Sequence, residues 1–397
     1  MQPPSDAATP VVSAFYDRFP YPGDPLEDGP PPGYNWRWCV DSVRAFVAGR
    51  LDPEARTWRI LDAGCGTGVS TDYLCHLNPG SSVLAVDISP GAVAVARERL
   101  QRSGAAEQAG DLRLEERSLL DLSDEGQFDY INSVGVLHHL DQPGAGLRAL
   151  AERLAPGGLL HLFLYADGGR WEIQRCQRAL RLMGVGTEQE GVALGRQLFR
   201  DLPEANRLRL DHERRWAIDT ATDANFADMY LHPQETRYDL ARLFRFVEGA
   251  GLQFAGFSNP QVWDPSRLLK GNLLERALAL PPQQQWQLVE SLDPDISHYE
   301  FFLSHTPISR WEGTDQELLA CGGVRNRCLW GWPSTSLMGP ELQPLSIEPE
   351  DLAFMRALEA APRGTTLAEV NLPMPAAERV ARARGLLRDG VLLTIAP

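Results

Sequence analysis

Apolar runs and turn residues alternate along the first half of the chain in a way that predicts strands separated by helices. The clearest strand contains Ile60, Leu61 and Ala63, breaks into the glycine run "GCGTG" and leads into a helix. A second strand, "SSVLAVDIS", carries Asp87 near its end. Three further segments follow in order: "LRLEERSLLDL", "FDYINSVGVLHHL" and "RLAPGGLLHLFLY". This alternation predicts an α/β protein with a doubly wound parallel sheet.

The glycine run and Asp87 together indicate a nucleoside site. Glycine permits a tight turn that a Cβ would disfavour, and it lets a ligand approach the backbone closely. An acid at the end of the next strand can accept hydrogen bonds from ribose hydroxyls. The spacing is G-x-G-x-G, whereas a pyrophosphate-binding turn has G-x-G-x-x-G. We therefore expect a ligand without a pyrophosphate; the run alone is also compatible with an ordinary tight turn.

With the other segments, the turn resembles that of class I S-adenosylmethionine (SAM)-dependent methyltransferases, over roughly residues 58–165. The resemblance implies a Rossmann-like sheet of seven strands and SAM as the cofactor. It implies that the "DAGCGTG" turn holds the methionine moiety and Asp87 the ribose. Ser118 stands where the family usually has an acid beside the adenine. The implied cofactor-binding residues are Asp62, Gly64, Cys65, Gly66, Gly68, Asp87, Ile88, Ser118, Leu119 and Ser133.

Two histidines, His138 and His139, follow the fourth strand, where loops border the transferred methyl group. Either is a candidate general base, because imidazole titrates near neutral pH. The alternative is that the pair begins a helix and only packs there. The preceding "NSVG" lacks the Asn/Asp-Pro-Pro-aromatic loop of many amide and exocyclic-amine methyltransferases, so an amide acceptor needs another solution here.

The N-terminal stretch "FYDRFPYPGDP" is rich in aromatic residues and proline. Proline restricts the stretch to extended or turn conformations, and an arm of this kind is suited to closing over the cofactor. We predict that Tyr16 or Tyr21, also catalytic candidates, borders the active site together with Asn35 and Trp36. The alternative is an arm that only packs on the outside of the sheet.

Beyond the fifth strand, helical spacing predicts insertions over about residues 167–235 and 261–297. Between them, a helix over residues 237–248 and a strand over 252–257 are expected, and "HYEFFLSHTP" is expected to be the seventh strand. The loop "DANFADMYLHP" offers Phe226, Tyr230 and His232 as substrate contacts. Packing of the inserted helices is the alternative role for these residues.

The rest of the chain predicts a small winged-helix-like module, with a helix over 349–361, another over 375–389 and a terminal strand. The predicted domains are an N-terminal arm or lid (1–56), a methyltransferase domain (57–307) and this module (308–397). The apolar spacing of the second helix favours a protein contact or homo-oligomer over DNA binding. Fold alone does not decide this role.

Composition limits the partners of this 397-residue chain. The net charge of −15 argues against nucleic acid. No apolar run is long enough for a transmembrane helix, and "MQPPSDAATP" does not read as a signal peptide, so we expect a cytoplasmic protein without a membrane partner. The six cysteines show no metal-binding spacing, and no metal is expected.

Two classes of methyl acceptor are compatible with the sequence. The amount of chain outside the core favours a protein acceptor. In addition, "AFYDRFPYPGDP" with "PPPGYNWRW" resembles cyanobacterial methyltransferases that modify an asparagine of phycobiliprotein β subunits. Loops like "GVLHHL" are widespread among small-molecule methyltransferases, which supports a metabolite acceptor. A non-catalytic SAM-binding scaffold is a third alternative, but the intact glycine turn and Asp87 argue against it.

Overall fold

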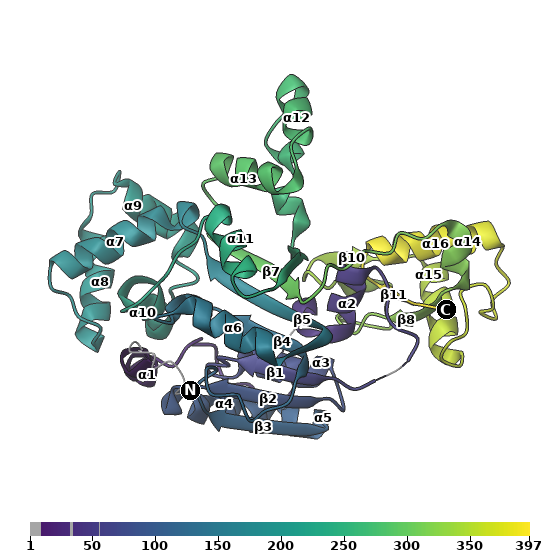
Figure 1. The fold of residues 1–397 in the computed structure, drawn as a ribbon, viewed down its shortest axis with the longest axis horizontal. Helices are drawn as coiled ribbons and strands as arrows, with labels where there is room; N and C mark the ends of the chain where they lie inside the picture. Colours follow the sequence, from purple (N-terminus) through teal and green to yellow (C-terminus); the bar gives the residue numbers. More distant parts are fainter. Residues whose placement is uncertain (1–8, 32–34, 55) are drawn as a thin grey trace.

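The computed structural model describes residues 9–31, 35–54 and 56–397 (Figure 1). The stretches "MQPPSDAATP" and "PPPGYNWRW" lie partly outside this range. Within these described residues, no helix combines the length and apolar character needed to cross a membrane.

A seven-stranded sheet forms the centre of the molecule, in the order β3-β2-β1-β4-β5-β7-β6. Strands β1 to β5 are parallel, whereas β7 runs antiparallel to both β5 and β6. This arrangement confirms the predicted fold. The order reverses between β1 and β4, and ligands bind at such a switch point, beside the carboxyl ends of the strands. The strands are β1 (Arg59–Ala63), β2 (Ser82–Asp87), β3 (Asp111–Glu116), β4 (Phe128–Val134), β5 (Leu154–Tyr165), β6 (Gln253–Phe257) and β7 (His298–Ser304).

Helices cover both faces of the sheet (Figure 1). Successive strand residues face opposite sides, so β1 gives Leu61 to one apolar core and Ile60 to the other. The first core includes residues of α6, α11 and α13, and the second includes residues of α2, α3 and α4. These helices, with the short α5, are α2 (Val40–Ala48), α3 (Val69–Leu77), α4 (Pro90–Ser103), α5 (Ala105–Gln108), α6 (Pro143–Arg153), α11 (Leu240–Glu248) and α13 (Pro282–Leu292).

The first predicted insertion is a helical layer beside the sheet, and the N-terminal arm packs against it. Phe15 and Phe19 share an apolar core with Ile173 and Phe226 of that layer. The arm differs from the extended chain expected: its first part is helix α1 (Thr9–Arg18), because the prolines that restrict it all follow residue 18. The inserted helices are α7 (Trp171–Leu182), α8 (Gln189–Asp201), α9 (Arg207–Asp211), a π-helical turn (His212–Trp216) and α10 (Asp223–Leu231).

The second insertion projects away from the body of the molecule, at the top of Figure 1. It consists of two 3-10 turns, Pro260–Trp263 and Pro265–Arg267, followed by α12 (Gly271–Leu278) and the start of α13. Leucines remain exposed on this projection, including Leu273 and Leu278.

The C-terminal part has its own apolar core, formed around Phe354, Met355 and Leu386. Its terminal strand pairs antiparallel with β8, so helix, helix and strand follow the predicted order. The arginines of its last helix bond within the module: Arg382 pairs with Asp351, and Arg384 with Asp315. The elements are α14 (Asp315–Ala320), β8 (Gly322–Arg325), β9 (Ser336–Met338), β10 (Pro344–Ser346), α15 (Pro349–Ala360), α16 (Ala376–Arg388) and β11 (Leu392–Ile395).

This C-terminal module is attached to the segment around α2. Leu51 forms a parallel β-bridge with Ile395, and the Trp311 N–H donates to the Ala48 carbonyl at 2.9 Å. The predicted limits of the three domains stay predictions, because neither the arm nor the module is separated from the central domain by a contact-free linker.

Candidate functional site

The glycine turn between β1 and α3 has the backbone shape expected from its sequence. Gly64 has φ +84° and Gly66 has φ +52°, both in the left-handed region that favours glycine. A Cβ on Gly64 would lie 2.3 Å from Val136 Cγ2, and one on Gly66 would lie 2.3 Å from the Tyr21 carbonyl oxygen. The turn is therefore packed between the loop after β4 and the N-terminal arm, and a side chain at either position would separate them.

Asp87 lies beside this turn at the end of β2. Its carboxylate accepts the Gly66 N–H at 2.8 Å and the Ser89 N–H at 2.9 Å. Burial raises the pKa of Asp87, while these backbone hydrogen bonds lower it. Each carboxylate oxygen has further lone pairs, so Asp87 can hold the turn and still accept hydrogen bonds from a diol. This geometry fits the adenosine ribose of the cofactor implied by the sequence.

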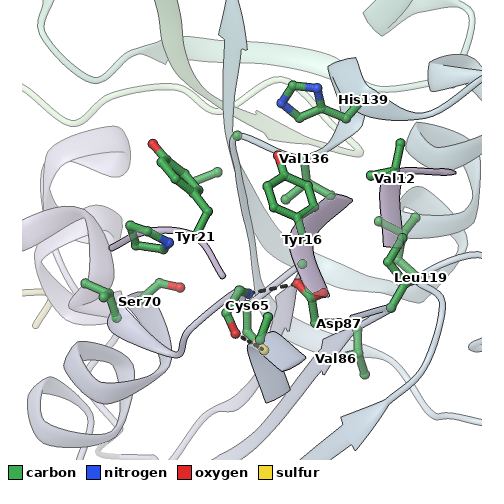
Figure 2. Close-up of a pocket in the computed structure, with 18 of the residues that line it drawn as sticks. Val12, Tyr16, Tyr21, Cys65, Ser70, Val86, Asp87, Leu119, Val136 and His139 are labelled. Atoms are coloured by element: carbon green, nitrogen blue, oxygen red, sulfur yellow. Dashed lines mark hydrogen bonds between the residues drawn. The ribbon is translucent and has the colours of Figure 1, made fainter. Parts of the chain in front are cut away.

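A cavity of about 230 Å³ opens at the switch point beside the turn (Figure 2). Its walls combine the glycine turn, the ends of β2 and β4, the loop after β3, and the N-terminal arm. Most of the residues predicted from the sequence to bind the cofactor or to act in catalysis therefore come together. Those that line the cavity are Tyr16, Tyr21, Gly64, Cys65, Gly66, Asp87, Ile88, Ser118, Leu119 and His139.

The N-terminal arm is bonded directly to the glycine turn. The Thr67 N–H donates to the Tyr21 carbonyl at 3.0 Å, and its hydroxyl donates to the Pro22 carbonyl at 2.7 Å. The buried Arg99 joins the same parts, because its guanidinium donates to the carbonyls of Thr67, Asp24 and Pro25. The arm thus forms a wall of the cavity rather than padding on the outer face of the sheet.

We expect Thr67→Val to weaken SAM binding roughly fivefold. The substitution keeps the side-chain shape but removes the hydroxyl bond to Pro22, worth about 1 kcal/mol. The arm that presents Tyr16 and Tyr21 to the cavity is then held less firmly. Isothermal titration with SAM measures the change, with the exposed Thr57→Val as control. Equal affinity for the two variants would show that this bond does not contribute.

At the end of the cavity away from Asp87, aromatic and polar side chains meet beneath the arm. Figure 2 shows Tyr21, Tyr16 and His139 above Asp87 in the view. The Tyr16 hydroxyl donates to Asp228 Oδ1 at 2.8 Å, and the Tyr165 hydroxyl lies 3.3 Å from Asp228 Oδ2. Burial, with the nearby Asp228 carboxylate, raises the pKa of Tyr16. Asp228, from the inserted α10, was not singled out from the sequence.

Three of the residues predicted to bind the cofactor do not line the cavity. Asp62 is buried beneath the turn, where it accepts hydrogen bonds from Ser70, Thr71 and Asn132. It therefore supports the turn rather than reaching a methionine amine. The Ser133 hydroxyl donates to the Ala63 carbonyl at 3.1 Å. Gly68 serves helix packing, because a Cβ there would lie 2.9 Å from Ala96 Cβ.

The remaining candidates are also displaced from the cavity wall. His138 is fully buried, with its ring stacked on Tyr165 at a centroid distance of 3.9 Å, and burial lowers its pKa. Phe226 and Tyr230 belong to the apolar core of the inserted helices, as the packing alternative expected. His232 lies behind His139, with 3.7 Å between ring centroids.

The expectation that Asn35 and Trp36 border the site is wrong, and Trp38 takes that place. A 3-10 turn (Trp36–Trp38) begins with Asn35 as its cap, and it directs Trp36 toward Glu341 of the C-terminal module at 2.7 Å. Trp38 lines the cavity and donates to Asn132 Oδ1 at 3.1 Å. The repeated tryptophan in "NWRW" was the available signal.

Other lining residues not predicted are Val12, Pro22, Val69, Ser70, Val86, Ala92, Arg117, Val134, Gly135, Val136 and Leu140.

Comparison with known proteins identifies the domain and several relatives. A family model described as a methyltransferase domain matches residues 61–160. An uncharacterized Synechococcus protein is 46% identical over 98% of this chain and 94% of its own length. A phycocyanin operon protein of Pseudanabaena tenuis, also uncharacterized, is 50% identical over 26% of this chain and 94% of its own length.

More distant similarities agree with the fold. A ubiquinone biosynthesis O-methyltransferase of Xanthomonas axonopodis is 36% identical over 36% of this chain, and the match spans 54% of that enzyme. The solved structure of PKMT2 from Rickettsia typhi in complex with AdoHcy superposes with a TM-score of 0.60 at 18% identity. That superposition covers 92% of this chain and 77% of PKMT2, so the likeness of fold extends beyond the central sheet.

Proposed function

Because the chain belongs to the class I SAM-dependent methyltransferases, we propose that its acceptor is a protein side chain, the asparagine of a phycobiliprotein β subunit. The observation that carries this proposal is the 50% identity with the phycocyanin operon protein. Proteins encoded in one operon often act in the production of the same final protein or metabolite. The resemblance of the N-terminal stretch to asparagine methyltransferases of phycobiliproteins supports the same acceptor.

The residues of the cavity fit the cofactor and suit methyl transfer. Bound SAM supplies an electrophilic methyl group on sulfur. The glycine turn and Asp87 hold its methionine and ribose parts, and the loop with Ser118 and Leu119 borders the adenine end. The arm covers the opposite end with Tyr16 and Tyr21, which limits access of water to the reacting groups. Positioning the acceptor in line with the methyl group supplies much of the acceleration.

The acceptor is tested with a phycocyanin β subunit produced in a host without this protein. Incubation with the purified protein and methyl-labelled SAM should label the β subunit, and peptide mass spectrometry should find one added methyl on an asparagine. A β subunit with that asparagine replaced by glutamine is the matched control and should stay unlabelled. An unlabelled wild-type β subunit would contradict the proposed acceptor.

A small-molecule acceptor is the second candidate, favoured by the match to the ubiquinone biosynthesis O-methyltransferase. Incubating the protein and labelled SAM with an extract of its source separates the two. Label in a discrete protein band supports the protein acceptor, whereas label confined to the small-molecule fraction supports the second candidate.

A further inference from the structure

One residue, Gln234, fixes the protonated nitrogen of two neighbouring histidines at the arm end of the cavity. The Gln234 carbonyl lies 2.8 Å from His139 Nδ1. A carbonyl oxygen only accepts, so Nδ1 of His139 carries the hydrogen in this bond. The Nε2 atom of His139 is then left with a lone pair, and no other described residue is hydrogen-bonded to it. His139 lines the cavity and can present this lone pair to a ligand.

The backbone of the same residue gives His232 the opposite tautomer. The Gln234 N–H donates to His232 Nδ1 at 3.1 Å, so the neutral His232 carries its hydrogen on Nε2. Burial lowers the pKa of His232, which keeps the ring neutral. Its Nε2 is buried and has no hydrogen-bond partner among the described residues.

These tautomers argue against a metal centre. One ligand atom each from His139, Asp228 and His232 lie within 4.8 Å of one another, a spacing that could hold an ion. A metal ligand needs a free imidazole lone pair. The lone pair of His232 is already used at Nδ1 by the Gln234 N–H. A cation on Nε2 would therefore cost this backbone hydrogen bond.

Asp228 is placed to balance a positive charge on His139. Its carboxyl group is buried, and one of its oxygens lies within 4.8 Å of a ring nitrogen of His139. Tyr16 and Tyr165 orient it through their hydroxyl groups. Burial raises the pKa of Asp228, whereas the nearby His139 and the Tyr16 hydrogen bond lower it. A proton gained by the His139 ring and the Asp228 carboxylate would therefore stabilise each other.

Tyr21 supplies a free donor on the same side of the cavity. Its side chain lines the cavity, and no hydrogen bond joins its hydroxyl to another described residue. Burial raises the pKa of Tyr21, so the phenol keeps its proton at neutral pH. The rings of Tyr21 and Tyr16 lie 6.4 Å apart, and those of Tyr16 and His139 lie 6.3 Å apart. Tyr16 is thus a neighbour of both the donor and the acceptor residue.

We infer that His139 and Tyr21 form a carboxamide site, in which His139 Nε2 accepts the amide N–H and the Tyr21 hydroxyl donates to the amide oxygen. This inference rests on the proposed function, because the amide is that of the acceptor side chain. A donor and an acceptor facing one cavity match the two edges of a carboxamide, whereas a carboxylate offers only acceptors. This pair replaces the Asn/Asp-Pro-Pro-aromatic loop that the chain lacks.

The same pair explains how a weakly nucleophilic nitrogen can react. The nitrogen lone pair of an amide is delocalised into its carbonyl, and removal of the N–H proton frees it. His139 Nε2 takes this proton as the amide nitrogen forms its bond to the methyl carbon. The S–C bond breaks with its electron pair remaining on sulfur, which gives AdoHcy and an N-methylamide. Asp228 balances the imidazolium until the proton passes to water, and Asp228 is therefore a positioning residue.

The first test uses acetamide as the probe, without any protein acceptor. Nitrogen-15 histidine spectra of the full-length protein saturated with AdoHcy should show His139 protonated on Nδ1 and His232 on Nε2. Acetamide should shift the His139 Nε2 resonance, and acetate should not. Tyr21→Phe should weaken acetamide binding about fivefold through loss of one hydrogen bond. An equal shift with acetate, no shift with acetamide, or loss of the His232 Nε2 proton to micromolar Zn²⁺ would overturn the inference.

The second test separates base catalysis from binding. We expect His139→Gln to lower kcat for the phycocyanin β subunit about 100-fold with unchanged SAM affinity, and Tyr21→Phe to act mainly on KM. The control is His305→Gln, because His305 is exposed and lies outside the cavity. A His139→Gln variant with the kcat of this control would overturn the role as base.

The two proposals can fail separately. If acetamide binds as described but the β subunit is not methylated, the carboxamide site stands and the proposed acceptor is wrong. If the β subunit is methylated but acetamide leaves His139 unchanged, the acceptor stands and the carboxamide site is wrong.

Discussion

Asp87→Asn is expected to weaken SAM binding roughly 100-fold, equivalent to about 3 kcal/mol. The carboxylate is placed to accept from both ribose hydroxyls, and such charge-assisted bonds contribute about 1.5–3 kcal/mol each. The Gly66 N–H bonds to Asp87 Oδ2 and the Ser89 N–H to Oδ1, whereas the amide of asparagine offers only one oxygen. Isothermal titration with SAM measures the loss.

The matched control for this prediction is Glu116→Gln. Glu116 pairs with Asp87 in the register of β3 and β2, but it is exposed and does not line the cavity. The Glu116→Gln variant loses the same charge from the same edge of the sheet. Its SAM affinity should stay within a factor of about two of the wild-type affinity. Equal losses in the two variants would mean that net charge, and not the ribose contact, controls binding.

Arg379→Met is expected to destabilise the C-terminal module by about 3–4 kcal/mol. The buried Arg379 guanidinium donates to the carbonyls of Met374, Leu367, Val370 and Leu372, at distances between 2.6 and 3.0 Å. It organises the loop between α15 and α16 through these bonds. Methionine fills a similar volume but leaves the carbonyls without this donor.

Urea unfolding, monitored by circular dichroism, measures the loss of stability caused by Arg379→Met. The control is Arg388→Met on the same helix, because the side chain of Arg388 is 77% exposed and pairs only with the adjacent Asp389 among the described residues. We expect its unfolding midpoint to match that of the wild type. A midpoint for Arg379→Met equal to that of Arg388→Met would show that water replaces the arginine without cost.

The sheet and the cofactor end of the cavity could be predicted because their signals are local in sequence. Each strand is an apolar run closed by a turn, and the glycine turn and Asp87 belong to adjacent strand-helix units. The predictions of a methyltransferase fold and of SAM as the cofactor are confirmed. The roles of the individual site residues stay predictions, which the variants above test.

Tyr16, Tyr21 and His139 were expected at the arm end of the cavity and line it, but their partners could not be predicted because these contacts join distant parts of the chain. Tyr16 meets Asp228 across 212 residues, and His139 meets Gln234 across 95. No local pattern marks Asp228 as a partner of either. The error of predicting Trp36 instead of Trp38 has a different cause. A single 3-10 turn determines which of the two tryptophans faces the cavity, and the spacing of the residues does not reveal the direction of each side chain.

The attachment of the C-terminal module to α2 has a consequence for synthesis on the ribosome. Thr394 donates to the Gly49 carbonyl across 345 residues, beside the bridge between Leu51 and Ile395. At translation rates of about 5–20 residues per second, Thr394 is synthesised roughly 20–70 s after Gly49. Leu51 lacks the apolar contacts with Leu393 and Ile395 during that time. We therefore expect this contact to form late in synthesis, after the sheet of the central domain can already fold.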